Sequence, residues 1–202
     1  MNRAELIYEQ PNLGDGTHDG GALINSGRFA FLMILGADVM LYVGLIGGYL
    51  VLRGGSLSWP PPGSPKLDMM LMLWSLPALI LSAVTLGMSI RSQAQNNPRK
   101  MRLALLLSLV MMVAFLAVNA VEWQRLLQAG LDVMTVFGGI YLILTGTMLL
   151  HVIVASLFAT RILSISKEPG YNARSGNALT HLGYFVYLQS IVWIALFGLI
   201  YL

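Results

Sequence analysis

The sequence predicts an all-α fold, an integral membrane bundle of five transmembrane helices. Of its 202 residues, 56% are hydrophobic and only 10% are charged, whereas a soluble domain carries about a quarter charged residues. The mean hydropathy is +0.72. Five windows are apolar over the roughly 20 residues that a helix needs to cross a bilayer. They cover about residues 29–52, 69–90, 103–127, 136–163 and 182–202. Their continuous apolar character favours helices over the alternating strands of a barrel.

The first window contains a single carboxylate, Asp38, near its middle. Asp38 follows Phe29 by nine residues, which is about 13–14 Å along a helix and close to the bilayer midplane. Such a residue usually marks a site for a proton, an ion or a ligand. The alternative is a polar residue whose hydrogen bonds are merely satisfied within the fold. Further along, Gly44 and Gly48 have the spacing that favours close helix packing.

The second window follows a loop in which Trp59 precedes three prolines. Tryptophan is enriched at the membrane interface, so Trp59 is expected there. The window itself contains Pro77, which lacks an N–H group and clashes with the preceding turn. A kink in the second helix is therefore expected.

Polar and aromatic residues also occur in the last three windows. Glu122 and Trp123 lie near one end of the third window, where the acid is either a solvated interfacial anchor or a functional group. His151 lies within the fourth window, and no second histidine falls in a predicted span. A metal or haem site would need a second ligand, so His151 is interpreted as a hydrogen-bonded packing residue. The fifth window contains Gln189 and Trp193.

The distribution of basic residues predicts the orientation of the bundle. With alternating crossings, nine of the twelve lysines and arginines fall on the side of the N-terminus and three on the other. Cytoplasmic loops carry the excess of positive charge. We therefore expect residues 1–27 to form a mobile cytoplasmic tail, residues 28–202 to form the membrane domain, and the C-terminus to lie outside. The tail lacks the apolar core of a cleavable signal peptide.

Several classes of function are disfavoured by the residues present. The chain has no cysteine, which excludes thiolate metal sites, iron-sulfur clusters and a cysteine nucleophile. No nucleic-acid module, nucleophile-base pair or phosphate-binding glycine loop is found in the sequence. The twelve methionines are spread through the apolar windows and are interpreted as packing residues. We expect no active centre, metal or cofactor on this chain.

Four segments in a fixed order carry a resemblance to a known family. They are "ADVMLYVGLIGGYL", "WPPPGSPKLDMMLMLWSLPALILSAVTL", "LAVNAVEWQRLL" and "FGGIYLILTGTMLLHVIVASLF". Together they resemble the carboxylate helix, the tryptophan-proline loop and the glutamate and histidine segments of subunit III of the haem-copper terminal oxidases. The family includes the subunits III of cytochrome c oxidases and quinol oxidases, and the match covers nearly all the chain from residue 28.

The sequence departs from the family pattern at four positions. Asp38 stands where the family usually has glutamate, and Met148 replaces the first of two histidines in the fourth segment. In "VYLQSIVW", Tyr187 and Ser190 occupy the usual histidine and aspartate positions, while Trp193 is retained. The departures indicate a divergent branch of the family.

The resemblance implies a bacterial five-helix form in the plasma membrane and an accessory role in aerobic respiration. Haem and copper would be held by partner chains, chiefly subunit I, with subunit II in the same complex. Phospholipid would bind in a cleft between the family's first helices and the rest. Asp38 would support proton uptake or contact lipid, and the helix-fixing or lipid-contact residues would be Glu122, His151, Trp59, Trp123 and Trp193.

Other functions stay open from the sequence. The chain could be a subunit III-like protein of a nitric-oxide reductase or of another respiratory complex. A small proton-coupled transporter that uses Asp38 and Glu122 is a further alternative, although no inverted repeat is found in the sequence.

Overall fold

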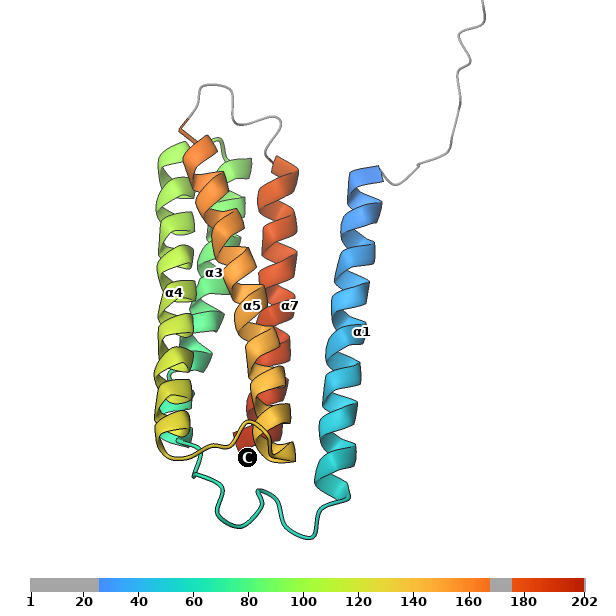
Figure 1. Ribbon diagram of the computed structural model, residues 1–202. Helices are drawn as coiled ribbons and strands as arrows, with labels where there is room; N and C mark the ends of the chain where they lie inside the picture. The colour runs from blue at the N-terminus through green and yellow to red at the C-terminus, as the bar shows by residue number, and fades with distance from the viewer. Residues whose placement is uncertain (1–25, 168–175, 202) are drawn as a thin grey trace, which may run out of the picture.

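The computed structural model describes residues 26–167 and 176–201, and all regular structure in these ranges is helical (Figure 1). The expected tail, residues 1–27, therefore lies almost entirely outside the described residues. The helices are α1 (Ser26–Gly54), α2 (Met69–Leu73), α3 (Ser75–Ala94), α4 (Pro98–Gln128), α5 (Val136–Ile165) and α7 (Gly176–Tyr201). Five helical stretches are long and apolar enough to cross a membrane, counting α2 with α3. The predicted five-helix fold is confirmed.

The second span is broken into two helices instead of being kinked. The break lies at Trp74, between α2 and α3, three residues before Pro77. A proline ring clashes with the carbonyl group four residues earlier, and here that residue is Leu73, the last of α2. Ser75 Oγ donates to the carbonyl oxygen of Met72 at 2.6 Å, which satisfies one of the carbonyl groups at the break.

The last helix begins earlier than expected, at Gly176 and not near residue 182. His181 consequently belongs to the membrane span Asn177–Tyr201. The sequence-based boundary was too late because the first residues of α7 are less apolar than the rest. The imidazole ring of His181 stacks on Phe31 of α1, with 4.3 Å between ring centroids.

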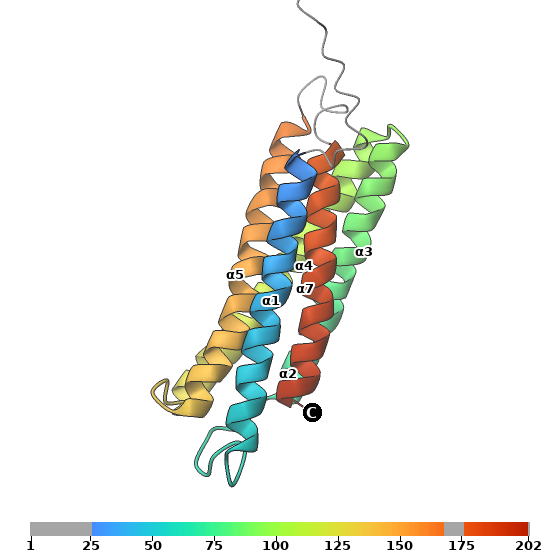
Figure 2. The ribbon, with the colours of Figure 1, turned by 90° about the vertical axis from the view of Figure 1, so that its right-hand side faces the viewer.

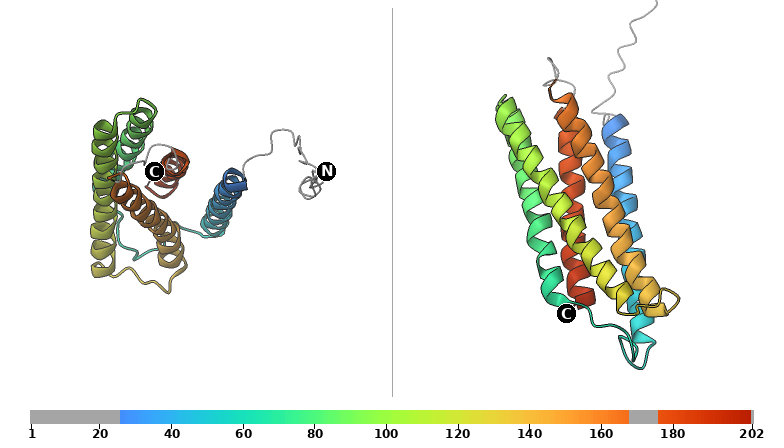
Figure 3. Two further views of the ribbon diagram at one scale, coloured as in Figure 1. Left: turned by 90° about the horizontal axis from the view of Figure 1, so that it is seen from above. Right: turned by 60° about the vertical axis from the view of Figure 1, so that its left-hand side comes forward.

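Helices α3, α4, α5 and α7 form a compact group, and α1 lies at its edge (Figures 2 and 3). Helix α3 packs mainly on α4 and α7, and α5 also packs on α4 and α7. Helix α1 packs on α5 and α7, and both of these contacts are small compared with those inside the four-helix group. Only 11% of its most apolar window is buried, compared with 28–44% for the other spans. Most of α1 therefore faces lipid or another protein.

Small polar groups and one tryptophan lock the four-helix group together. Trp193 of α7 is buried, donates from Nε1 to Ser75 Oγ at 2.9 Å, and meets the ring of Phe115 edge-on. Ser108 Oγ of α4 donates to the carbonyl oxygen of Ser82 in α3 at 2.9 Å. Such contacts between helices are effective in a membrane because small side chains let the backbones approach closely.

Candidate functional site

A buried polar cluster joins α1 to α5 and α7 near the middle of the membrane spans. Its centre is Asp38 of α1, whose side chain is only 5% exposed. Gln189 Nε2 of α7 donates to Asp38 Oδ2 at 2.6 Å. His151 Nε2 of α5 lies 2.9 Å from Asp38 Oδ1, an ion-pair distance, although no well-aligned hydrogen bond from a described residue reaches this oxygen. Side chains from two other helices thus partner the acid.

Tyr42, one turn after Asp38 on α1, completes the cluster. Its hydroxyl donates to Gln189 Oε1 at 3.0 Å and lies 3.4 Å from His151 Nδ1 and 3.5 Å from Met148 Sδ. Because the Gln189 carbonyl oxygen accepts from Tyr42, its amide nitrogen must face Asp38. The amide of Gln189 is therefore held in one orientation by two residues of α1.

The contacts of His151 indicate which ring nitrogen faces Asp38. His151 Nδ1 lies 2.6 Å from the carbonyl oxygen of Thr147, which can only accept, so Nδ1 carries a hydrogen. Nε2 is then the ring nitrogen that lies 2.9 Å from Asp38 Oδ1. An imidazole nitrogen and a carboxyl oxygen at this distance are close enough to exchange a proton.

The cluster is sealed on the Asp38 side and more open on the His151 side. Gln189 is fully buried, whereas 20% of the His151 side chain is exposed. His151 is therefore the member of the pair that the surroundings of the bundle can reach.

Glu122 forms a separate polar site near the C-terminal end of α4. It is 1% exposed, and its Oε1 accepts the backbone N–H of Asp68 at 3.0 Å. Its Oε2 has no hydrogen-bond partner among the described residues, and neither has Oδ1 of Asn119, one turn earlier. Of the two sequence-based alternatives for Glu122, the burial disfavours a solvated anchor.

Asp68 couples this site to the loop before α2. Its carboxylate accepts the backbone N–H of Leu71 at 3.0 Å, as an N-cap of α2, and pairs with the guanidinium of Arg125. The hydrogen bond from Leu71, followed by that from Arg125, lowers the pKa of the Asp68 carboxyl below its ordinary value. Asp68 is thus a carboxylate that anchors the loop to the end of α4.

The two other tryptophans considered from the sequence lie towards the same end as Glu122. Trp59 is half-buried, donates to the hydroxyl of Tyr49 at 3.0 Å and meets the Phe137 ring edge-on. Trp123 donates to Thr145 Oγ1 at 3.1 Å. Both indole N–H groups are therefore used to join elements of this chain.

The structure brings Asp38 and His151 together and keeps Glu122 apart from them. Sequence reasoning did not find the roles of Tyr42 and Gln189 as partners of the acid. Gln189 was noticed as a polar residue of the fifth window, and its amide needs a hydrogen-bond partner in a membrane, but the sequence did not indicate which residue that partner is. No comparable signal marks Tyr42. Within residues 26–167 and 176–201, no three His, Cys, Asp or Glu side chains gather as a possible metal site.

Comparison with known proteins gives a consistent set of matches. A family model described as cytochrome c oxidase subunit III matches residues 7–202. The cytochrome c oxidase subunit 3 of a Synechocystis species is 28% identical over 179 residues, which is 86% of this chain and 74% of the relative. That of Thermostichus vulcanus is 27% identical over 173 residues, 85% and 84% of the two chains. A probable cytochrome c oxidase subunit 3 of Nocardia farcinica is 26% identical over 168 residues, 83% of each chain.

Proposed function

This chain belongs to the cytochrome c oxidase subunit III family, and from that premise we propose that it is a non-catalytic subunit of a bacterial respiratory haem-copper oxidase. Membership implies association with other oxidase subunits. We expect subunit I to be the main partner and subunit II to be part of the same complex. Haem and copper would be held on those chains, where oxygen reduction would take place.

The proposed contribution of this chain is to support proton uptake by the catalytic subunit and to stabilise it. The observation that carries this proposal is the 2.9 Å approach of His151 Nε2 to Asp38 Oδ1 within the membrane spans. A buried acid beside an imidazole can take up and release a proton when a neighbouring path supplies it. The partly exposed ring of His151 offers the point of exchange.

We further propose the orientation that the basic residues predict. Seven cations of the described residues lie at the end of the bundle where α1 begins and α3 ends. They are Arg28, Arg91, Arg99, Lys100, Arg102, Arg161 and Lys167. The positive-inside rule assigns this end to the cytoplasm of a bacterial plasma membrane. Asp38 then lies on a helix that starts at the cytoplasmic side.

Helix fixation is the role we propose for the second group of polar residues. Glu122 binds the backbone before α2, and Trp59, Trp123 and Trp193 each join two segments through an indole N–H. The lipid-facing part of these segments would also contact phospholipid. Loss of these residues should affect stability more than proton uptake.

Co-purification tests the main proposal. A tagged copy is extracted from native membranes in mild detergent, and the visible spectrum and the identity of the accompanying chains are determined. Haem and copper oxidase chains in fixed proportion are expected. Stable isolation of a metal-free protein without such chains would count against the proposal, and a nitric-oxide reductase in their place would assign the subunit to that complex.

The proton role is tested in the purified complex. Asp38→Ala should leave assembly and the initial rate of oxygen reduction mostly intact but reduce proton uptake or shorten the working lifetime of the enzyme. Asp68→Asn is the control, because Asp68 is an acid outside the Asp38 cluster. Complete loss of the haem signal in Asp38→Ala would instead assign Asp38 to assembly.

A further inference from the structure

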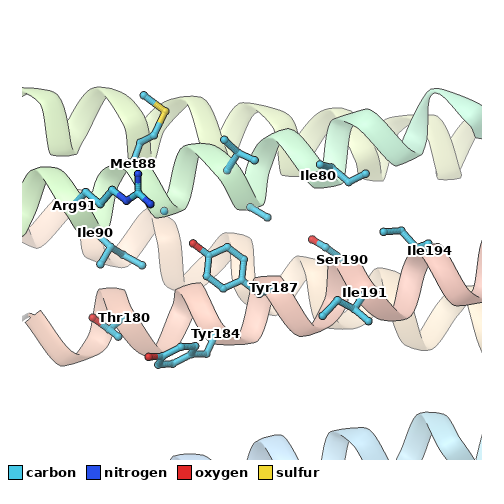
Figure 4. Close-up of a pocket in the computed structure, with 13 residues that line it drawn as sticks. Ile80, Met88, Ile90, Arg91, Thr180, Tyr184, Tyr187, Ser190, Ile191 and Ile194 are labelled. Carbon is cyan, nitrogen blue, oxygen red and sulfur yellow. The ribbon is translucent and has the colours of Figure 1, made fainter.

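An open groove of about 690 Å³ lies along the seam between α3 and α7 (Figure 4). Its sides carry large apolar side chains, among them Ile80, Val84 and Ile191, and its floor includes the buried Ala83. The Asp38 cluster uses none of these residues. A volume of this size is within the range of sites that bind small molecules.

The groove is about as long as one leaflet of a bilayer is thick. On α3 the lining runs from Ile80 to Arg91, 11 residue steps or about 16 Å, and on α7 from Thr180 to Ile194, 14 residue steps or about 21 Å. Half of a hydrocarbon core is about 15 Å. An acyl chain of one leaflet matches this length, whereas a helix of a partner subunit would extend across both leaflets.

The groove has a positive charge at one end. Arg91 lies in the last turn of α3, is exposed, and has no ion-pair partner among the described residues. In Figure 4 its guanidinium lies alongside Met88, over the groove. A basic residue here is also favoured by the helix dipole, so the charge alone selects no ligand. A charge beside an apolar groove matches a lipid with an anionic headgroup.

A hydroxyl group lies one turn deeper in the groove. Tyr187 of α7 points its phenol oxygen at Gly87 of α3, and a Cβ atom on Gly87 would lie 2.5 Å from that oxygen. Glycine is therefore required for this placement of the ring. The hydroxyl makes no hydrogen bond within the described part of the chain, so it is available as a donor to a bound ligand.

We propose that this groove binds an anionic diacyl phospholipid of the cytoplasmic leaflet, with its phosphate at Arg91, an ester carbonyl oxygen at Tyr187 and one acyl chain against the apolar sides. The inference deepens the lipid contact of the proposed function and rests on that function for the membrane setting and orientation. The groove is distinct from the cleft implied by the family resemblance, because it is built from α3 and α7 only.

The binding test uses the full chain in mild detergent after delipidation. Phosphatidylglycerol is added back, with phosphatidylcholine of the same acyl chains for comparison, and binding is measured by native mass spectrometry. One phosphatidylglycerol is expected to bind per chain, more tightly than phosphatidylcholine. Inorganic phosphate alone should not compete with phosphatidylglycerol for the groove, because it lacks the acyl chain. Equal binding of both lipids, or competition by phosphate, would overturn the proposal.

Matched variants identify the site. Arg91→Gln removes a charged hydrogen-bond donor and should weaken phosphatidylglycerol binding about tenfold, while Arg161→Gln, at the same end of α5, should not. Val84→Trp should block the groove, whereas Val113→Trp, at an equally exposed position of α4, should leave binding intact. The two valines are 53% and 54% exposed, so neither change disturbs the core.

Three outcomes would contradict the assignment to this groove. They are equal losses in Arg91→Gln and Arg161→Gln, unchanged binding in Val84→Trp, and a partner helix occupying the groove in the assembled complex. Thermal unfolding of each variant without lipid confirms that it is folded. The haem that co-purifies with the chain is measured in a separate experiment. A loss of lipid binding can therefore be told apart from a wrong assignment to the oxidase.

Discussion

The polar sites around Asp38 and Glu122 each bury a carboxyl group in a membrane span, yet they are partnered in different ways. Asp38 is contacted by side chains of α5 and α7, which approach it only when three helices pack. Glu122 accepts one backbone N–H from the loop before α2, and its second oxygen has no partner among the described residues. The first site therefore links three helices, while the second anchors a loop.

Removal of the Asp38 carboxyl group should have the largest effect in this comparison. Asp38→Ala leaves the amide of Gln189 and the ring of His151 without their partner, and an unsatisfied buried group costs about 1–3 kcal/mol. The free energy of unfolding, measured by denaturant titration in mixed micelles, should fall by this amount. Helix α1 should also become more accessible to protease, because Tyr42 would be left as the hydrogen-bonded link at its middle, while Phe31 and Tyr49 act near its ends.

The conservative variant Asp38→Asn is the matched control for this change. An asparagine can accept from Gln189 and donate to His151 Nε2, which reproduces the form in which Asp38 is protonated. It should retain most of the stability and lose the proton function. If it destabilises as much as alanine, the pair exists as a carboxylate with an imidazolium.

Gln189→Leu should have a smaller effect and test whether α7 is coupled to the acid. Hydrogen bonds between helices in a membrane contribute about 0.6 kcal/mol on average and up to about 1.7. We expect a loss of about 1 kcal/mol in the free energy of unfolding. In a double-mutant cycle, Gln189→Leu should cost little more once Asp38→Ala is present. Strict additivity of the two changes would show that the bond contributes nothing.

Glu122→Gln should be nearly neutral, within about 0.5 kcal/mol, because the N–H of Asp68 needs only an acceptor and the amide oxygen supplies one. Glu122→Leu removes the acceptor and should cost about 1 kcal/mol. Both values come from the same micelle titration. A large loss in the glutamine variant would mean that the negative charge of Glu122, and not its hydrogen bond, stabilises the loop.

The smallest expected effect is the contribution of the Asp68 carboxyl group to the dependence of stability on pH. Its pKa is lowered in the folded protein by the Leu71 N–H and the Arg125 guanidinium, so the folded state binds the proton less readily than the unfolded chain. This stabilisation is complete above the ordinary carboxyl pKa and is lost as the pH falls through the lowered value. Asp68→Asn should lower the melting temperature slightly at neutral pH, where the stabilisation is complete, and the two curves should converge as the pH falls, so the variant's curve is flatter on the acid side. Parallel curves for the two proteins would contradict this.

The sequence predicted the helices better than their connections. Each window was located by its apolar length, and the structure places a helix over all five. The effect of Pro77 was expected, but the break falls at Trp74, because the clash acts on the turn before the proline. The start of α7 was missed by several residues, since its first turn lacks the apolar character used to find it.

The candidate residues could be found one by one but not assembled. Asp38, Glu122 and His151 were noticed because polar groups inside apolar windows are costly. Their grouping depends on how α1 lies against α5 and α7, which hydropathy does not encode. The departures from the family pattern are explained only in part: Met148 contacts the hydroxyl of Tyr42, and Tyr187 faces the α3–α7 groove.

By itself, the sequence determined that the chain crosses a membrane five times as helices and belongs with the subunits III of the haem-copper oxidases. Transfer of long apolar segments into lipid is a local property, so composition is enough to predict it. The tertiary structure alone decided that Asp38 lies beside His151 and that Gln189 and Tyr42 close the cluster. These contacts join residues more than 100 positions apart, and they exist only after the helices have packed.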